Sequence, residues 1–195
     1  MLSYFIYKIL SCLPDLEKFK LYFKAIVLLR IFILNLSNSK KISYKSTIYK
    51  GVFIPNKIQL YIADNVKIKS NVIIQGKFLK VEKRVVISNN CFLDCEGEIF
   101  IESNSFIGKR VEVYSHHHDY TKKDFDIFQS REKFMKTKIG KNCIIYNNAI
   151  IGPGVTIADD CVIANNSLLI SSTDASSIYV GNPAKKILSK FNPHK

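Results

Sequence analysis

IGKNCIIYNNAIIGPGVTIADDCVIANNSLL, residues 139–169, is the stretch that decides the fold of this 195-residue chain. An aliphatic residue returns in it at every sixth position: Ile139, Ile145, Ile151, Ile157, Ile163 and Leu169. A small or β-branched residue follows four positions after each of the first five: Cys143, Ala149, Val155, Cys161 and Ser167. Neither an α-helix nor a simple alternating strand generates this double spacing. The stretch therefore predicts a solenoid, in which the chain folds over at a fixed interval.

The same register is legible, less regularly, from Val52 onward, for example in Ile62 with Val66. About seventeen hexads at three per turn predict fewer than six turns, stacked near the ~4.8 Å spacing of hydrogen-bonded strands. Asn and Asp stand between the apolar positions, as in 147–148 and 165–166. Both residue types tolerate left-handed dihedrals and suit tight corners. The expected fold is an all-β solenoid.

The register breaks after His118 and resumes only at Ile139. The intervening residues are polar and charged, with scattered aromatic side chains and no six-residue period. Long loops in compact domains are usually functional or disordered, and the aromatic residues favour an ordered loop. We expect a loop over residues 119–138 that leaves the coil and folds onto something.

Residues 1–45 predict a helical arm that is apolar on nearly all faces. Its apolar runs are interrupted by Arg30 and are too short for the roughly 20 residues that span a bilayer. Two interpretations remain. The arm caps the open end of the solenoid, or it lies in a membrane interface as a peripheral contact, with Lys18, Lys20, Lys24 and Arg30 reaching anionic lipid.

Composition narrows the partners and the compartment. Twenty-nine basic and sixteen acidic residues give a net charge of +13, and residues 1–50 hold nine of the basic residues against two acidic ones. This balance favours anionic partners, but no motif that reads DNA or RNA is present, so nucleic acid is not expected. Five cysteines without a CxxC spacing argue against a disulfide framework. With no signal-peptide pattern at Met1, we expect a cytoplasmic protein, with the inner face of the membrane as the alternative.

Two short motifs carry a family resemblance: Ile151-Gly152-Pro153-Gly154-Val155-Thr156-Ile157, and Gly181-Asn182-Pro183-Ala184-Lys185. With the hexad repeat, they resemble the hexapeptide-repeat acyltransferases, and most of all the maltose and galactoside acetyltransferase-like branch with its polysaccharide O-acetyltransferases. The resemblance covers residues 52–188. It implies a left-handed parallel β-helix, a homotrimer, and acetyl-CoA as co-substrate between neighbouring subunits. The expected layout is an arm over 1–45, the β-helix over 46–175, and a tail over 176–195 with a short C-terminal helix.

The histidines of Val113-Tyr114-Ser115-His116-His117-His118 are the candidates for chemistry. In a strand, alternation places His116 and His118 on one face and His117 on the other. The resemblance assigns the catalytic base to the residue that closes the hexad before the loop, which is His118. An imidazole suits removal of a hydroxyl proton, with His116 or Asp119 orienting the base or placing the acceptor. The alternatives are a solvated polar turn and a metal site, and no metal is expected because only two of the three histidines converge.

Further site residues follow from the resemblance alone. Asp94 matches the position where the sugar-acetylating branch presents an aspartate to its acceptor, and the alternative is a solvated corner carboxylate. The family's coenzyme A contacts map onto five residues: Asn147, Asn165, Ile170, Ser171 and Lys185.

A cysteine nucleophile would be a rival mechanism. Cys91, Cys143 and Cys161 fall on inward repeat positions, Cys12 lies in the N-terminal arm, and only Cys95 has an outward setting. Direct transfer from donor to acceptor is therefore favoured.

The expected function is acetyl-CoA-dependent O-acetylation of a cell-surface saccharide (capsule, O-antigen or lipooligosaccharide) or its precursor. The alternatives are N-acetylation of an amino sugar or an antibiotic, and a non-catalytic β-helix that serves as an interaction module.

Overall fold

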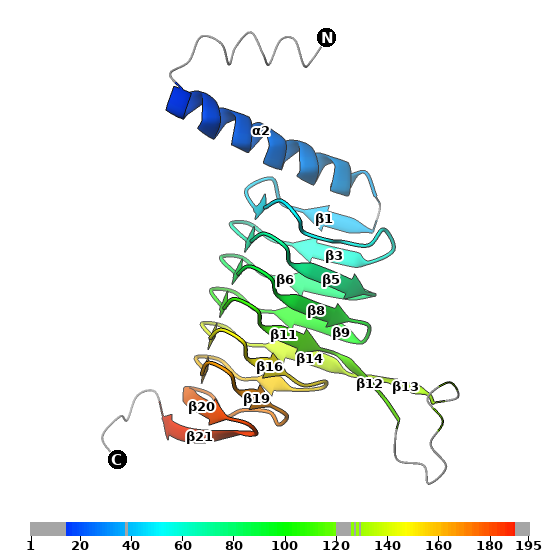
Figure 1. Ribbon diagram of the computed structural model, residues 1–195, viewed down its shortest axis with the longest axis vertical. Coiled ribbons are helices and arrows are strands. Elements are labelled where there is room, and N and C mark those ends of the chain that lie inside the picture. Colours follow the sequence, from blue (N-terminus) through cyan, green and yellow to red (C-terminus); the bar gives the residue numbers. More distant parts are fainter. Residues whose placement is uncertain (1–14, 38, 120–125, 127, 129, 190–195) are drawn as a thin grey trace.

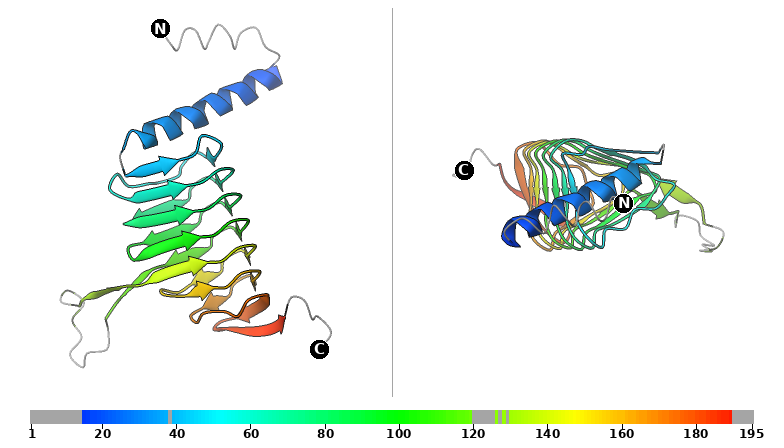
Figure 2. Two further views of the ribbon diagram at one scale, coloured as in Figure 1. Left: turned by 180° about the vertical axis from the view of Figure 1, so that it is seen from behind. Right: turned by 90° about the horizontal axis from the view of Figure 1, so that it is seen from above.

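The chain forms a β-solenoid of about seven turns with one helix, α2, across its N-terminal end. This computed structural model describes residues 15–37, 39–119, 126, 128 and 130–189 (Figure 1). Residues 120–125, 127 and 129 of the predicted loop, and Cys12, lie outside the described residues. Seen from above, the coils stack in register as a flattened column (Figure 2). The predicted solenoid is confirmed.

Each coil contributes one strand to each of three parallel stacks. Sheet A consists of β1 (Lys40–Ile42), β3 (Gln59–Ile62), β6 (Phe78–Val81), β9 (Glu98–Ile101), β14 (Lys136–Ile139) and β17 (Thr156–Ile157). Sheet B consists of β2 (Thr47–Ile48), β4 (Lys67–Ile68), β7 (Val86–Ile87), β10 (Phe106–Ile107), β15 (Ile144–Ile145), β18 (Val162–Ile163), β20 (Ser177–Gly181) and β21 (Ala184–Ser189). Sheet C consists of β5 (Ile73–Gly76), β8 (Phe92–Cys95), β11 (Glu112–Tyr114), β16 (Ile150–Ile151) and β19 (Leu168–Leu169). A separate antiparallel pair is made by β12 (His116–His118) and β13 (Glu132–Phe134).

The hexad residues form the core. All six aliphatic residues of the 139–169 repeat are at most 1% exposed, and the small residues four positions later are buried too. Stacking places like on like: Ile107 pairs with Ile145, which pairs with Ile163. The interior is thus a set of aliphatic columns removed from water, which is the main stabilising contribution.

The corners depend on the predicted Asn and Asp residues. Positive φ angles between 55° and 63° occur at ten of them or their equivalents, and these are Asn65, Asn71, Arg84, Asn90, Asn104, Arg110, Asn142, Asn148, Asp160 and Asn166. Asn104, Asn142 and Asp160 are joined side chain to side chain down one edge, by hydrogen bonds of 2.8 and 3.2 Å. The corners therefore combine local dihedral preference with a ladder of polar contacts.

The predicted number of turns, fewer than six, is too small. The first strand, β1, begins at Lys40, ahead of the hexad register that is legible in the sequence, and β20 adds a turn after Leu169. The early coils are also longer: Leu60 lies opposite Leu79 and Leu79 opposite Ile99, whereas Lys138 lies opposite Thr156. Coils of 19 or 20 residues obscure a six-residue period that the later 18-residue coils keep.

Helix α2 (Asp15–Asn35) covers the open end of the first coil (Figure 1). Val27 and Ile31 are buried against it, at 6% and 0% exposure. The Asn35 carboxamide acts like one more strand residue, because its Nδ2 donates to the Ile42 oxygen at 2.8 Å and its Oδ1 accepts from the Ile42 nitrogen at 2.9 Å. The interpretation of the arm as a cap is confirmed. Among the described residues, no helix is long and apolar enough to cross a membrane.

The predicted C-terminal helix is wrong. Ala184–Ser189 form strand β21, which turns back at Gly181-Asn182-Pro183 and pairs antiparallel with β20. The reason is the last coil's position at the end of sheet B, where its outer edge would otherwise present unpaired backbone groups. Pairing with β21 satisfies them.

Candidate active site

The hairpin β12–β13 leaves the solenoid at the corner between sheets C and A, in the fourth coil, and projects sideways (Figures 1 and 2). Two buried hydroxyls fix the two ends of the excursion. Ser115 Oγ donates to the backbone oxygen of Asp94 at 2.5 Å and accepts from the backbone nitrogen of Gly97 at 2.9 Å. Thr137 Oγ1 donates to the backbone oxygen of Tyr114 at 2.7 Å. The insertion therefore starts and ends at defined positions on a rigid coil.

Gly97 makes this departure possible. A β-carbon at residue 97 would collide with the backbone of Ser115 and of Met135, the two points where the chain leaves and rejoins the coil. Backbone atoms cannot rotate away as a flexible side chain can, so only glycine fits.

The Asp94 carboxylate and the His116 imidazole lie in close contact. Asp94 lies on β8 opposite Tyr114 of β11, and it is 3% exposed. Its Oδ2 is 2.8 Å from His116 Nδ1. This separation is that of an ion pair when the imidazole is protonated, but the two groups are not aligned for a hydrogen bond. Burial raises the pKa of the Asp94 carboxyl above its ordinary value, and the charge of the neighbouring His116 opposes that rise.

His118 lies on the same side of β12 as His116, as alternation predicts, with ring centres 6.3 Å apart. Its Nδ1 hydrogen-bonds with Ser130 Oγ at 2.9 Å, across the hairpin. His117 has a different setting, because its Nδ1 hydrogen-bonds with the backbone oxygen of His118 at 2.8 Å. His118 Nδ1 is hydrogen-bonded and His116 Nδ1 faces the Asp94 carboxylate, so in both rings Nε2 is the nitrogen that can exchange a proton with a substrate.

Asp119 continues the β12–β13 ladder directly beyond His118. One of its carboxylate oxygens is 3.1 Å from Lys133 Nζ, and its backbone nitrogen donates to the Arg131 oxygen at 2.9 Å. The contacts in the described chain thus hold the hairpin, and Asp119 is not in the contact between Asp94 and His116.

Further residues border the cluster. Lys77 Nζ lies 3.7 Å from the centre of the Phe134 ring and 3.4 Å from Glu96 Oε2. The Phe134 ring in turn lies 6.4 Å from that of His116. Sequence reasoning missed Lys77, Glu96, Phe134 and Ser130. Glu96 and Lys77 could have been found by counting one and two coils back from His116, whereas Phe134 and Ser130 depend on how the hairpin pairs.

The five predicted coenzyme A residues do not join this cluster within one chain. Asn147 and Asn165 lie at the corner between sheets B and C, where Asn165 Oδ1 accepts from the Asn147 nitrogen at 3.1 Å. Ile170, 61% exposed, and Ser171 follow β19 on the same edge of sheet C as Asp94 but three coils further on. Lys185 lies on β21, opposite Val180. The structure therefore spreads these residues over both edges of sheet C and the last coil.

The cysteines offer no accessible thiolate among the described residues. Cys91, Cys95, Cys143 and Cys161 are all buried. Burial raises the pKa of Cys91 to about 11 and that of Cys143 to about 12, and it raises the pKa of Cys95 well above its ordinary value. The expected outward setting of Cys95 is wrong, because the longer early coils turn its side chain into the core at 0% exposure.

No three His, Cys, Asp or Glu side chains of the described part gather into a metal-binding group. A pocket of about 270 Å³ lies elsewhere, between α2 and the first coil. It is lined by no histidine, carboxylate or thiol: Arg30, Ile33, Leu34, Ile48, Tyr49, Gly51, Val52 and Ile54. The histidine cluster is therefore the site in the described chain with acid–base groups arranged for chemistry.

Comparison with known proteins identifies the repeat. Residues 136–171 match the family model of the bacterial transferase hexapeptide (six repeats). A probable macrolide acetyltransferase of Lysinibacillus sphaericus is 46% identical over 59 residues, which is 30% of this chain and 33% of that protein. A chloramphenicol acetyltransferase of Agrobacterium fabrum is 39% identical over 56 residues, 29% of this chain and 27% of that protein. The matched segment thus spans about a third of these relatives or less.

Solved structures share the fold. AntD, an N-acyltransferase from Bacillus cereus solved with dTDP-4-amino-4,6-dideoxyglucose and coenzyme A, superimposes with a TM-score of 0.66 at 22% identity, over 83% of this chain and 89% of that one. A maltose O-acetyltransferase from Clostridium difficile 630 gives a TM-score of 0.52 at 20% identity, over 94% and 82% of the two chains. This chain thus carries a bacterial transferase hexapeptide repeat over residues 136–171 and shares the solenoid fold of these structures.

Proposed function

We propose that this protein is an acetyl-CoA-dependent O-acetyltransferase whose acceptor is a cell-surface saccharide or its precursor. The observation that carries the proposal is the cluster of Asp94, His116 and His118 at the one place where the described coil is interrupted by a long insertion. The hexapeptide repeat and the acetyltransferase relatives support acetyl transfer. The maltose O-acetyltransferase fold supports a sugar acceptor.

In the proposed reaction, His118 acts as general base. Its Nε2 takes the proton of an acceptor hydroxyl while the hydroxyl oxygen attacks the thioester carbonyl carbon. The new C–O bond gives the acetyl ester, the C–S bond breaks, and the coenzyme A thiolate leaves and receives the proton from His118. The hydrogen bond with Ser130 holds the His118 ring in one orientation.

His116 and Asp94 have a positioning role in this proposal. The pair presents a polar, largely buried edge beside His118, where acceptor hydroxyls can donate to carboxylate oxygen and accept from imidazole. Coenzyme A is proposed to lie along the exposed edge of sheet C, bordered by Ile170 and Ser171 from one copy. Asn147, Asn165 and Lys185 are proposed to border it from the neighbouring copy of a homotrimer.

N-acetylation of an amino sugar or antibiotic is the second candidate, favoured by the fold shared with the Bacillus cereus N-acyltransferase. The same base serves both reactions, because either an amine or a hydroxyl must lose a proton as it attacks. The products differ: O-acetylation gives a base-labile ester, and N-acetylation gives a stable amide.

The test is a thioester-cleavage assay against a panel of oligosaccharides and amino sugars, with His118→Ala and His117→Ala side by side. His117 is the matched control, since it is the same residue type one position away with a different hydrogen-bond setting. His118→Ala should lower turnover by about 10²- to 10⁴-fold, and His117→Ala should retain most of it.

Near-normal turnover by His118→Ala would reject the assignment of the base. A loss confined to His116→Ala would move the base to that residue. Absence of thiol release with every acceptor would favour the non-catalytic interaction module.

A further inference from the structure

Helix α2 has an uncovered apolar face opposite the one that caps the solenoid. We call it the outer stripe: Tyr22, Leu29, Phe32 and Ile33 of the helix with Leu36 directly after it, which are between 51% and 69% exposed. Ile33 lies at the edge of the stripe and also lines the pocket between α2 and the first coil. On the inner side, Val27 and Ile31 are buried. Both of these faces are apolar, and among the residues that the structure describes only the inner face is covered.

Capping elements of solenoids normally carry a polar outer face, which keeps the end of the stack in solution. The outer stripe does the opposite. Its positions recur at helical spacing over fifteen residues, about 21 Å of helix. A contiguous apolar surface of this kind marks a site of interaction with another molecule or a membrane.

The charge around the stripe has one sign. From Leu21 to Ile62 the chain contains seven basic residues and no acidic one: Lys24, Arg30, Lys40, Lys41, Lys45, Lys50 and Lys57. Lys40 is buried and donates to the Asn56 oxygen, and Lys45 pairs with Asp64. Lys24, Lys41, Lys50 and Lys57 are exposed. Helix and first coil together therefore form a basic end on the molecule.

We propose that the outer stripe of α2 docks on an anionic membrane surface, with the helix lying in the plane of the interface. The stripe enters the boundary between headgroups and acyl chains, and the lysines reach lipid phosphates. Because a helix is about 10–12 Å thick, the first coil stands roughly one Debye length from the surface, where its charge still acts.

The alternatives fit the same surface less well. A second copy docked through the same stripe would bring two ends with no acidic residue over 21–62 against each other, and like charge opposes such contact. Insertion across the bilayer would strip Val27 and Ile31 from the first coil and bury Lys24 and Arg30 in lipid. Cap and membrane contact are thus not competing roles, because they use opposite faces of one helix.

The test is flotation of the full-length protein with vesicles of phosphatidylcholine, with and without phosphatidylglycerol. We expect binding to the phosphatidylglycerol vesicles that weakens as salt is raised. Ile33→Glu should reduce that binding by about tenfold or more, because it places a charge on the face that enters the interface.

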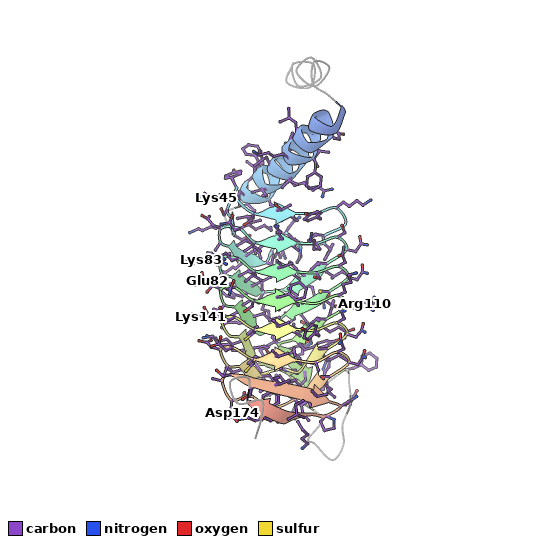
Figure 3. All side chains as sticks on the ribbon, turned by 90° about the vertical axis from the view of Figure 1, so that its left-hand side faces the viewer. Lys45, Glu82, Lys83, Arg110, Lys141 and Asp174 are labelled. Atoms are coloured by element: carbon purple, nitrogen blue, oxygen red, sulfur yellow. The ribbon has the colours of Figure 1, made fainter. Side chains whose placement is uncertain are left out.

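Matched controls are available at distant surfaces. Ile187→Glu makes the same change at a side chain of nearly equal exposure, 55% against 57% for Ile33, but on β21 at the opposite end of the solenoid. Lys24→Gln/Lys50→Gln removes two charges from the basic end, and Lys83→Gln/Lys141→Gln removes two from an edge of later coils (Figure 3). Only the variants at the basic end should lose binding.

Equal binding by native and Ile33→Glu protein would overturn the proposal, and so would equal loss in Ile33→Glu and Ile187→Glu. A change of oligomeric mass in Ile33→Glu without lipid would overturn it in favour of a second copy. These readouts need no acceptor and stay independent of the proposed acetyl transfer.

Discussion

Burial of the Asp94 side chain disfavours its charged form, at a residue that belongs to the proposed active site. Its side chain is nearly inaccessible, and burial raises its pKa above the ordinary 3.8, although His116 lies 2.8 Å away. A carboxyl whose pKa is raised on folding binds its proton more tightly in the folded chain. Its contribution to stability is therefore greatest in acid, and is lost as the pH rises from the unfolded-state pKa through the folded-state pKa.

Asp94→Asn should consequently separate activity from stability. At neutral pH the amide removes a buried charge but keeps the shape, so we expect the melting temperature to stay level or rise. Turnover should fall by at least about tenfold, since the amide cannot form the charge pair with His116. Thermal unfolding followed at neutral and at acidic pH, beside the thioester assay, measures both. A large loss of stability at neutral pH would show a structural role instead.

Some contacts of the candidate site could be predicted from the sequence, and others could not. The shared face of His116 and His118 follows from strand alternation alone, and the structure confirms it. That Asp94 lies against His116 does not follow from spacing, because it depends on a coil of 20 residues rather than 18. Ser130 reaches His118 only through hairpin pairing across a long insertion, which no local pattern specifies.

Among the secondary-structure elements, the β12–β13 hairpin depends on Gly97, which leaves room for the two strands to depart from the solenoid. Gly97→Ala places a methyl group against the backbone at Ser115 and Met135. We expect the hairpin to shift, with a loss of about 1–3 kcal/mol in the free energy of unfolding and a clear loss of turnover. Urea unfolding and the thioester assay measure these effects.

Gly152→Ala is the matched control for Gly97. It lies at the same corner two coils further on, and its added methyl group would meet nothing nearer than the Leu169 backbone oxygen at 3.3 Å. Its stability should change little. An equal loss in both variants would mean that Gly97 has no special role in launching the hairpin.

Elements were predictable where one physical constraint acts alone. The 18-residue coils show the hexad because every sixth residue must face inward, and those residues are buried as expected. The first coil could not be recognised from the hexad pattern. Its open end is closed by α2, and the Asn35 side chain of that helix hydrogen-bonds with the Ile42 backbone. The sequence predicts a short C-terminal helix where strand β21 forms. A short basic segment has no clear periodicity, and nothing in it indicates that the edge of β20 is available for pairing.

At the scale of the whole molecule, the outer face of sheet C carries a column of apolar side chains. Phe53, Ile73, Phe92, Ile150 and Leu168 lie one above another in register on it, interrupted by Glu112. Phe53 and Ile73 are 55% and 43% exposed. An apolar column beside the histidine corner is what a subunit interface would cover.

We therefore expect a homotrimer, with a mass three times the 22.3 kDa of one chain, measured by light scattering on a sizing column. Ile73→Glu should shift that mass to one chain, because it places a charge in the apolar column. It should lower turnover too, since coenzyme A is proposed to lie between copies. Ile33→Glu, of comparable chemistry but on the outer stripe of α2, should leave the mass unchanged. A native mass of one chain, or a trimer that survives Ile73→Glu, would contradict this assembly and would confine the acetyl-transfer site to residues of a single column.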